Sequence, residues 1–208
     1  MGKVGKLVAV AAALLGFTGL TYLYYRSVWE HNKRLRVVRP GVLYRSGQMT
    51  AEGFAEAVHA LGLKTIINVQ DDFPDPLIRK AWGGSIRESE LCERLGVRYV
   101  ALAPDLQPRG TPGGPRPLVL DQFLKVMDDP EAYPALIHCK AGLHRTGVLC
   151  AVWRVEYDGW GRDRAFLELK EHGFGDRACT GSNDYVRQYV LDYAPRVGRP
   201  GLASIKAP

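Results

Sequence analysis

The feature that most constrains this chain is a short apolar run that leads into a cysteine and is followed by an arginine. Residues 134–138 (PALIH) are apolar enough for a buried strand, a compact loop begins at Cys139, and Arg145 opens a segment with a helical pattern. A strand, a loop and a helix N-terminus in this order direct several backbone N–H groups at one anion. The stretch therefore predicts an anion-binding loop.

Cys139 and Arg145 give this loop its predicted chemistry. The planar guanidinium of Arg145 can hold two phosphate oxygens at once. Cys139 lies at the mouth of a positively charged loop, where a thiolate is favoured over a thiol. A nucleophile beside a bound phosphate implies attack on phosphorus. The alternative, a buried structural cysteine beside a helix-capping loop, explains neither Arg145 nor Thr146.

The spacing of a cysteine and an arginine does not by itself indicate an active site, because the chain contains a second pair with the same spacing. Cys92 and Arg98 are also separated by five residues. However, Glu93 would repel a phosphate, and Cys92 falls inside a predicted helix. Around Cys139 there is no acidic residue, and Gly142 permits a tight backbone path.

The sequence His138-Cys139, five further residues and Arg145-Thr146 resembles the signature loop of the cysteine-dependent protein-tyrosine and dual-specificity phosphatase superfamily. The resemblance covers residues 40–193 and implies a central sheet with helices on both faces and a cysteinyl-phosphate intermediate. It implies catalytic roles for Cys139 and Arg145, a Thr146 hydroxyl that helps the sulfur leave, and a His138 that packs behind the cysteine and orients the loop. The expected phosphate-binding residues are those of the loop: Lys140, Ala141, Gly142, Leu143, His144 and Arg145.

A second, weaker resemblance lies upstream. Residues 42–48 (VLYRSGQ) are expected to form a short strand that ends in a turn. They resemble the entry segment of small atypical dual-specificity phosphatases of bacteria, plants and fungi. Arg45 in this segment could reach the substrate or support the structure, and the structural role is favoured.

The mechanism also needs a carboxylic acid that protonates the leaving oxygen. Asp105 lies 34 positions before Cys139, on a loop after a predicted strand, where the resemblance implies the acid. It is the favoured candidate. Asp71 and Asp72 also follow a strand, and Asp121 lies within a predicted helix. A phosphatase without a dedicated acid is the remaining alternative.

The loop composition leaves two substrate classes open. Lys140 and His144 make the loop more basic than a phosphotyrosine site requires, and parts of it resemble the loops of phosphoinositide and inositol-pyrophosphate phosphatases. Both of those branches usually carry a lysine where this chain has Leu143. Phosphorylated tyrosine, serine or threonine in proteins is therefore the expected substrate, with phosphoinositides or inositol (pyro)phosphates as the alternative. A phosphate-binding adaptor without turnover is the non-enzymatic alternative, disfavoured because Cys139 and Arg145 are both present.

The net charge of +6 fits an anionic substrate or an anionic membrane surface. It does not argue for a nucleic-acid partner, because the sequence has no zinc-finger spacing and no aromatic-basic stacking motif. The four cysteines contain no CxxC pair and no metal-ligand cluster, so neither a metal nor a cofactor is expected. A nucleophilic cysteine needs reducing surroundings, which favours a cytoplasmic location for the catalytic domain.

Residues 7–25 are 19 consecutive residues without a charge, close to the roughly 20 that span a bilayer as a helix. A cleaved signal peptide is disfavoured by the length of the run and the lack of a clear cleavage site. A buried core helix is disfavoured by apolar residues on every face. Basic residues are more numerous after the run than before it, although Lys3 and Lys6 reduce the bias. The pattern predicts a single-pass anchor that leaves the following domain in the cytoplasm.

The predicted organisation is a short N-terminal segment (1–6), an anchor (7–25), a basic juxtamembrane linker (26–39), a phosphatase domain (40–194) and a disordered tail (195–208). The linker is expected either to lie against anionic headgroups or to be a solvated spacer.

Apolar periodicity predicts alternating strands and helices within the domain. Strands are expected at 42–48, 64–69, 97–103 and 134–138, and helices at 51–61, 86–95, 120–127, 148–157, 164–172 and 183–193. Thr50 and a Ser85-x-x-Glu88 capping box are the expected starts of the first two helices. The alternation predicts an α/β fold with a central, largely parallel sheet flanked by helices.

Overall fold

The computed structural model of the chain describes residues 2–70, 86–102, 117–175 and 186–198. Within these residues, short strands form one sheet. The strands are β1 (Arg36–Arg39), β2 (Leu43–Ser46), β3 (Thr65–Asn68), β4 (Arg98–Ala101) and β5 (Ala135–His138). Their order across the sheet is β1-β2-β5-β3-β4. All neighbours pair in parallel except β1, which is antiparallel to β2. The predicted largely parallel sheet is confirmed.

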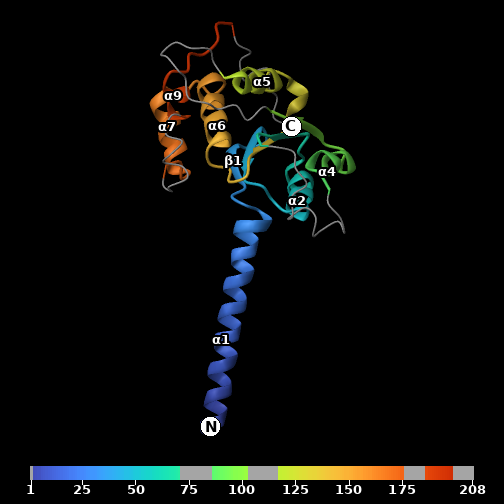
Figure 1. Ribbon diagram of the computed structural model, residues 1–208, viewed down its shortest axis with the longest axis vertical. Helices are drawn as coiled ribbons and strands as arrows, with labels where there is room; N and C mark the ends of the chain where they lie inside the picture. Colours follow the sequence, from blue (N-terminus) through green and yellow to red (C-terminus); the bar gives the residue numbers. More distant parts are fainter. Residues whose placement is uncertain (1, 71–85, 103–116, 176–185, 199–208) are drawn as a thin grey trace.

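Helices cover both faces of this sheet (Figure 1). The helices of the domain are α2 (Ala51–Leu61), α4 (Glu88–Leu95), α5 (Leu118–Met127), α6 (Arg145–Glu156), α7 (Arg162–Glu171) and α9 (Val186–Leu191), with a short 3₁₀ turn η2 (Pro130–Ala132). In Figure 1, α2 and α4 lie on one side, and α5, α6, α7 and α9 on the other. The six predicted helices are all present, with ends that differ from the prediction by up to three residues.

The core is divided by the sheet because successive side chains of a strand point to opposite faces. Ile66 and Leu136 belong to the apolar cluster under α2 and α4. Their chain neighbours Ile67 and Ile137 belong to the larger cluster under α5, α6 and α9. Both faces of the central strands are thus buried, as expected for parallel strands.

The predicted start of α4 is wrong. The first helical residue is Glu88, and Arg87 is the N-cap, with its N–H donating to Glu90 Oε2 at 3.3 Å. Glu88 therefore does not occupy the third helical position of a capping box with Ser85, which lies outside the described residues. Glu88 is instead buried, at 2% exposure, and its carboxylate contacts His138 and Gln48. The sequence pattern around Glu88 matched a local capping box and gave no sign of the contact with His138, 50 residues away.

Strand β1 corrects the predicted linker, which was expected to extend to residue 39. Residues 36–39 pair with β2, and Val38 is buried while the flanking Arg36 and Arg39 are not. Charged side chains are usual on an edge strand, where only one face is covered. An edge strand with partly exposed arginines has the same sequence pattern as a solvated linker, so the sequence did not distinguish the two.

The first residues of the predicted disordered tail are also ordered, at positions 195–198. The guanidinium of Arg196 bonds Asp128 through Nη1 and Nη2, both at 2.8 Å, and Glu156 Oε1 through Nε at 2.7 Å. Glu156 is fully buried, so Arg196 supplies the positive partner that its carboxylate needs. Hydrogen bonds from Arg196 hold the pKa of Asp128 below its usual value.

Helix α1 (Lys3–Arg26) projects away from the domain, and none of its residues is buried (Figure 1). It continues into a π-helical turn, η1 (Ser27–His31). By length and composition it is the one helix of the described chain that could cross a membrane, and a signal sequence passes the same test. The absence of buried residues in α1 does not fit a core helix.

Candidate active site

The loop after Cys139 lies at the carboxyl end of β5, the central strand of the sheet. His138 at this end is level with Ser46 of β2 and Asn68 of β3. The loop leads directly into α6, whose first residue is Arg145. Cys139 is 6% exposed, and nearly all of α6 is buried against the domain. The predicted strand, loop and helix N-terminus are therefore held rigidly in place.

Three successive carbonyl groups of this loop accept hydrogen bonds from outside it. The N–H of Gln48 donates to Lys140 O at 3.2 Å. Arg34 Nη1 donates to Ala141 O and Arg45 Nη2 donates to Gly142 O, each at 2.8 Å. In a planar trans peptide the N–H points opposite to the C=O. Fixing these carbonyls outward thus directs the N–H groups of residues 141–143 to the inner side of the loop.

Gly142 is required by this close packing. Its φ is +70°, and a Cβ there would lie 2.5 Å from Ser46 O and 2.6 Å from the Gly47 nitrogen. Any side chain would therefore push the loop off the end of β2, in addition to the strain of the left-handed conformation. The tight backbone path expected at Gly142 is present.

Arg45 supports the loop. Its side chain is 3% exposed, and the bond to Gly142 O comes from the sheet side. Of the two roles considered from the sequence, this geometry fits the structural one.

A buried network lies behind the loop and includes a residue that the sequence analysis missed. His138 is fully buried, and its Nε2 lies 2.6 Å from Glu88 Oε1. Glu88 Oε2 accepts a bond from Gln48 Nε2 at 3.0 Å, and Gln48 also donates its N–H to the loop. The His138 ring packs edge-on against Phe54, with centroids 5.1 Å apart. Glu88 thus links His138 to the turn that holds Lys140 O.

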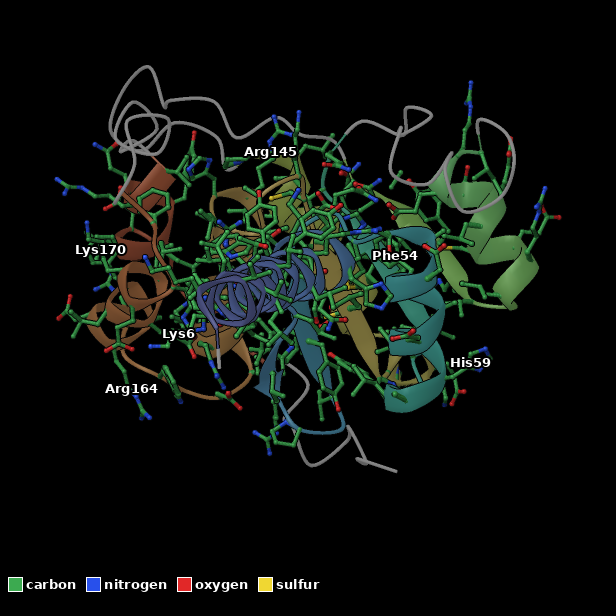
Figure 2. The ribbon with its side chains drawn as sticks, turned by 90° about the horizontal axis from the view of Figure 1, so that it is seen from below. Lys6, Phe54, His59, Arg145, Arg164 and Lys170 are labelled. Atoms are coloured by element: carbon green, nitrogen blue, oxygen red, sulfur yellow. The ribbon has the colours of Figure 1, made fainter. Side chains whose placement is uncertain are left out.

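Arg145 lies at the edge of the domain in Figure 2, where α1 is seen nearly end-on. Its Nη1 donates to Val69 O, at the end of β3, at 3.2 Å. The guanidinium is thus held at the sheet edge through one of its five N–H donors, and a guanidinium can also bind an anion through others. Thr146 is fully buried, and its Oγ1 has no hydrogen-bond partner among the described residues.

The other loop side chains differ in their surroundings. The His144 ring packs edge-on against Phe174, at 5.7 Å between centroids. Burial, and then the charge of Arg145, lower the pKa of His144, so the ring is neutral at pH 7. Lys140 is exposed and Leu143 is buried. The positive charge of the loop side chains therefore comes from Arg145 and Lys140 and not from His144.

The candidate acids are only partly described. Asp105, Asp71 and Asp72 lie outside the described residues. Strands β3 and β4 end level with each other, on the edge that carries Cys139, so both candidate segments begin at that edge. Asp121 is exposed in the first turn of α5.

The other described cysteines are more deeply buried than Cys139. Cys92 is fully buried within α4, as expected. Cys150 is buried in α6, and its burial raises the pKa of the thiol to about 11. It therefore remains protonated at neutral pH. Neither is in a disulfide, nor is Cys139; Cys179 lies outside the described residues.

A cysteine and an arginine at the two ends of an anion-binding loop, on the carboxyl edge of a parallel sheet, define a member of the cysteine-dependent phosphatase superfamily. Within it, the chain belongs to the dual-specificity phosphatases: the family described as "DSP-PTPase phosphatase fused to NAD+ Kinase" matches residues 27–178. The dual specificity protein phosphatase TpbA of Pseudomonas aeruginosa strain UCBPP-PA14 is 30% identical over 152 residues, which are 72% of this chain and 60% of that protein.

Solved structures share the fold. The catalytic core of Siw14 from S. cerevisiae superposes with a TM-score of 0.58 at 22% identity, covering 79% of this chain and 86% of that chain. TpbA of P. aeruginosa superposes with a TM-score of 0.54 at 23% identity, covering 77% and 90%. At these identities the likeness concerns the fold, and it confirms the phosphatase-like architecture.

Replacing Glu88 tests the buried network. Glu88→Ala removes the carboxylate that contacts both His138 Nε2 and Gln48 Nε2, which is expected to lower the free energy of unfolding by about 1–3 kcal/mol. Activity should fall as well, because Gln48 holds Lys140 O. Urea unfolding and kinetics on an aryl phosphate measure both effects. Glu93→Ala, an exposed change on the same helix, is the control. Equal behaviour of the two variants would contradict the role given to Glu88.

Proposed function

We propose that this chain hydrolyses phosphate monoesters through a cysteinyl-phosphate intermediate, with phosphotyrosine and phosphoserine or phosphothreonine of proteins as substrates. The observation that carries the proposal is the set of three outward-bonded loop carbonyls between Cys139 and Arg145. They direct the N–H groups of residues 141–143 to the inner side of the loop, where they can donate to a tetrahedral anion. Membership of the dual-specificity phosphatase family supports it.

In the proposed reaction the Cys139 thiolate attacks phosphorus, so an S–P bond forms as the ester P–O bond breaks. The loop N–H groups and Arg145 hold the non-bridging oxygens as charge redistributes. Water then cleaves the S–P bond and releases inorganic phosphate. The buried Thr146 hydroxyl, which lacks a partner among the described residues, is proposed to donate to the sulfur as it leaves. His138, held by Glu88, is proposed to fix the start of the loop.

Asp105 is the proposed acid. It lies four residues beyond Ala101, where β4 ends at the sheet edge that carries Cys139. From such a loop a carboxyl group can protonate the leaving oxygen and later take a proton from the attacking water.

The membrane is the proposed location, with α1 as a single-pass anchor and the catalytic domain in the cytoplasm. The exposed apolar surface of α1, none of whose residues is buried, supports this, because such a surface is costly in water. The basic residues that follow α1 support the orientation.

A panel of substrates decides between the protein substrates and the alternative, phosphoinositides or inositol (pyro)phosphates. The exposed Lys140 at the loop favours the more highly charged alternative, and the neutral His144 ring does not. Phosphopeptides, phosphoinositide vesicles and soluble inositol phosphates should be compared by kcat/KM. Preference for phosphopeptides is expected, and a clear preference for either inositol class would replace it.

Cys139→Ser is expected to abolish hydrolysis of a generic aryl phosphate, because a hydroxyl is a poor nucleophile at neutral pH. Binding of inorganic phosphate, measured by calorimetry, should survive because the loop N–H groups and Arg145 remain. Cys92→Ser is the control and should retain activity. Turnover by Cys139→Ser at the wild-type rate would exclude the mechanism. A wild-type protein that binds phosphate without turnover would instead be an adaptor.

Asp105→Asn is expected to lower kcat by about 10²–10⁴-fold on an alkyl phosphate, whose leaving group needs the proton. The loss should be smaller on a good leaving group, which departs as an anion. The matched comparisons are Asp71→Asn, Asp72→Asn and Asp121→Asn. A loss that depends on the leaving group at one of these, with Asp105→Asn near wild type, would transfer the role.

The full-length protein is expected to remain in the membrane fraction after a high-salt wash and to leave it with detergent. A reporter fused after Pro208 should score as cytoplasmic. Recovery in the soluble fraction at full length, or an extracytoplasmic reporter signal, would contradict the proposed anchor or its orientation.

A further inference from the structure

The segment that follows α1 is bound to the catalytic domain rather than solvated. His31 lies 2.8 Å from Glu56 Oε2 through Nε2 and 3.2 Å from Thr50 Oγ1 through Nδ1. Lys33 O accepts the N–H of Gly47 at 2.7 Å, and Arg34 donates to Ala141 O of the loop. The family match begins at residue 27, immediately after α1. The segment is therefore part of the catalytic unit.

The backbone of this segment adopts a costly conformation where it meets the loop. Lys33 and Arg34 both have positive φ, at 23° and 59°, which is uncommon for residues with a side chain. Such a strained conformation persists only where its surroundings impose it. The bonds from Gly47 to Lys33 O and from Arg34 to Ala141 O are among the contacts that hold it here.

The fit against the domain is close on both sides of this turn. A Cβ at Gly47 would lie 2.7 Å from Lys33 Cγ and 3.1 Å from Lys140 O. A Cβ at Gly53, in the first turn of α2, would collide with the carbonyl oxygen of His31. The absence of side chains at Gly47 and Gly53 thus allows residues 31–34 to pack closely against the domain.

Arg34 connects the end of the α1–η1 helix to the loop. Its guanidinium carbon lies 4.6 Å above the centre of the Trp29 ring, a cation–π distance, while Nη1 reaches Ala141 O. Trp29 belongs to η1, which continues α1 without interruption. Trp29, Arg34 and Leu143 also line a common hollow beside the loop. Of the three carbonyl anchors, Arg34 alone comes from the segment between α1 and the sheet.

We propose that Arg34 is a positioning residue of the active site, which holds the Ala141–Gly142 peptide with its N–H directed at the substrate phosphate. Trp29 holds the guanidinium in place, so the segment after the anchor sets the conformation of the catalytic loop. This inference rests on the proposed phosphatase function. It also predicts that the anchor and the catalytic loop cannot be treated as independent parts.

The test uses the full-length protein in detergent micelles and the variants Arg34→Met, Arg34→Lys and Trp29→Ala. Arg34→Met removes the bond and frees the peptide to rotate, so kcat/KM on an aryl phosphate should fall about 10- to 100-fold. The inhibition constant of inorganic phosphate should rise in parallel. Arg34→Lys, whose ammonium can still donate to a carbonyl, should recover part of the loss. Trp29→Ala should show a smaller loss in the same direction.

Arg98→Met is the matched control, because Arg98 also makes an arginine hydrogen bond, to Asp129 at 2.6 Å, at the opposite end of the sheet. It should leave both constants unchanged. Urea unfolding of every variant separates positioning from stability. Wild-type kinetics in Arg34→Met, or equal losses in Arg34→Met and Arg34→Lys, would overturn the inference.

The proposed function and this inference can fail separately. If the wild type shows no hydrolysis, the proposed function fails, and calorimetry with inorganic phosphate then tests Arg34 by itself. Weaker phosphate binding in Arg34→Met than in Arg98→Met would support the positioning role, and equal binding would exclude it.

Discussion

The hydrogen bonds from Gln48, Arg34 and Arg45 to three successive carbonyl groups hold the loop on which the rest of the site depends. Two of the three donors are guanidinium groups, and a bond to a charged group contributes about 1.5–3 kcal/mol. The loop N–H groups are thereby oriented before any anion arrives. Such preorganised donors cost no rearrangement during the reaction, which is the largest single contribution to many enzymatic rate enhancements.

The sheet order explains how donors so distant in sequence reach one loop. β5 lies between β2 and β3, and parallel strands bring their carboxyl ends to the same edge. Arg45 and the turn at Gln48 therefore flank the loop on one side, and Val69 meets Arg145 on the other. Behind the loop, the buried Glu88 carboxylate contacts His138 Nε2 and Gln48 Nε2, which supply the polar partners that a buried carboxylate requires. The segment that follows α1 contacts the loop from a further side, through Arg34.

The sequence predicted the parts of this arrangement that depend on local pattern. Apolar periodicity predicted the strand before Cys139, the helix at Arg145 and the alternation of strands and helices. The cysteine and arginine at the two ends of the loop predicted a site for an anion. It did not predict the contacts between distant segments. Glu88 meets His138 across 50 residues and Arg34 meets Ala141 across 107, and periodicity carries no information on such pairs. The edge strand β1 and the ion pairs of Arg196 were missed for a related reason. The arginines of β1 and Arg196 have the pattern of solvated residues, and only contacts with other segments of the chain make them part of the folded domain.

The most direct test of this account is to trap the intermediate. Full-length protein in detergent should be mixed with an aryl phosphate, quenched in acid within the first turnovers, digested and analysed by mass spectrometry. A phosphoryl group is expected on the peptide that contains Cys139, and it should be absent from Cys139→Ser and lost when the reaction is left to complete. Turnover without a phosphorylated Cys139, or with the phosphoryl group on another residue, would contradict it.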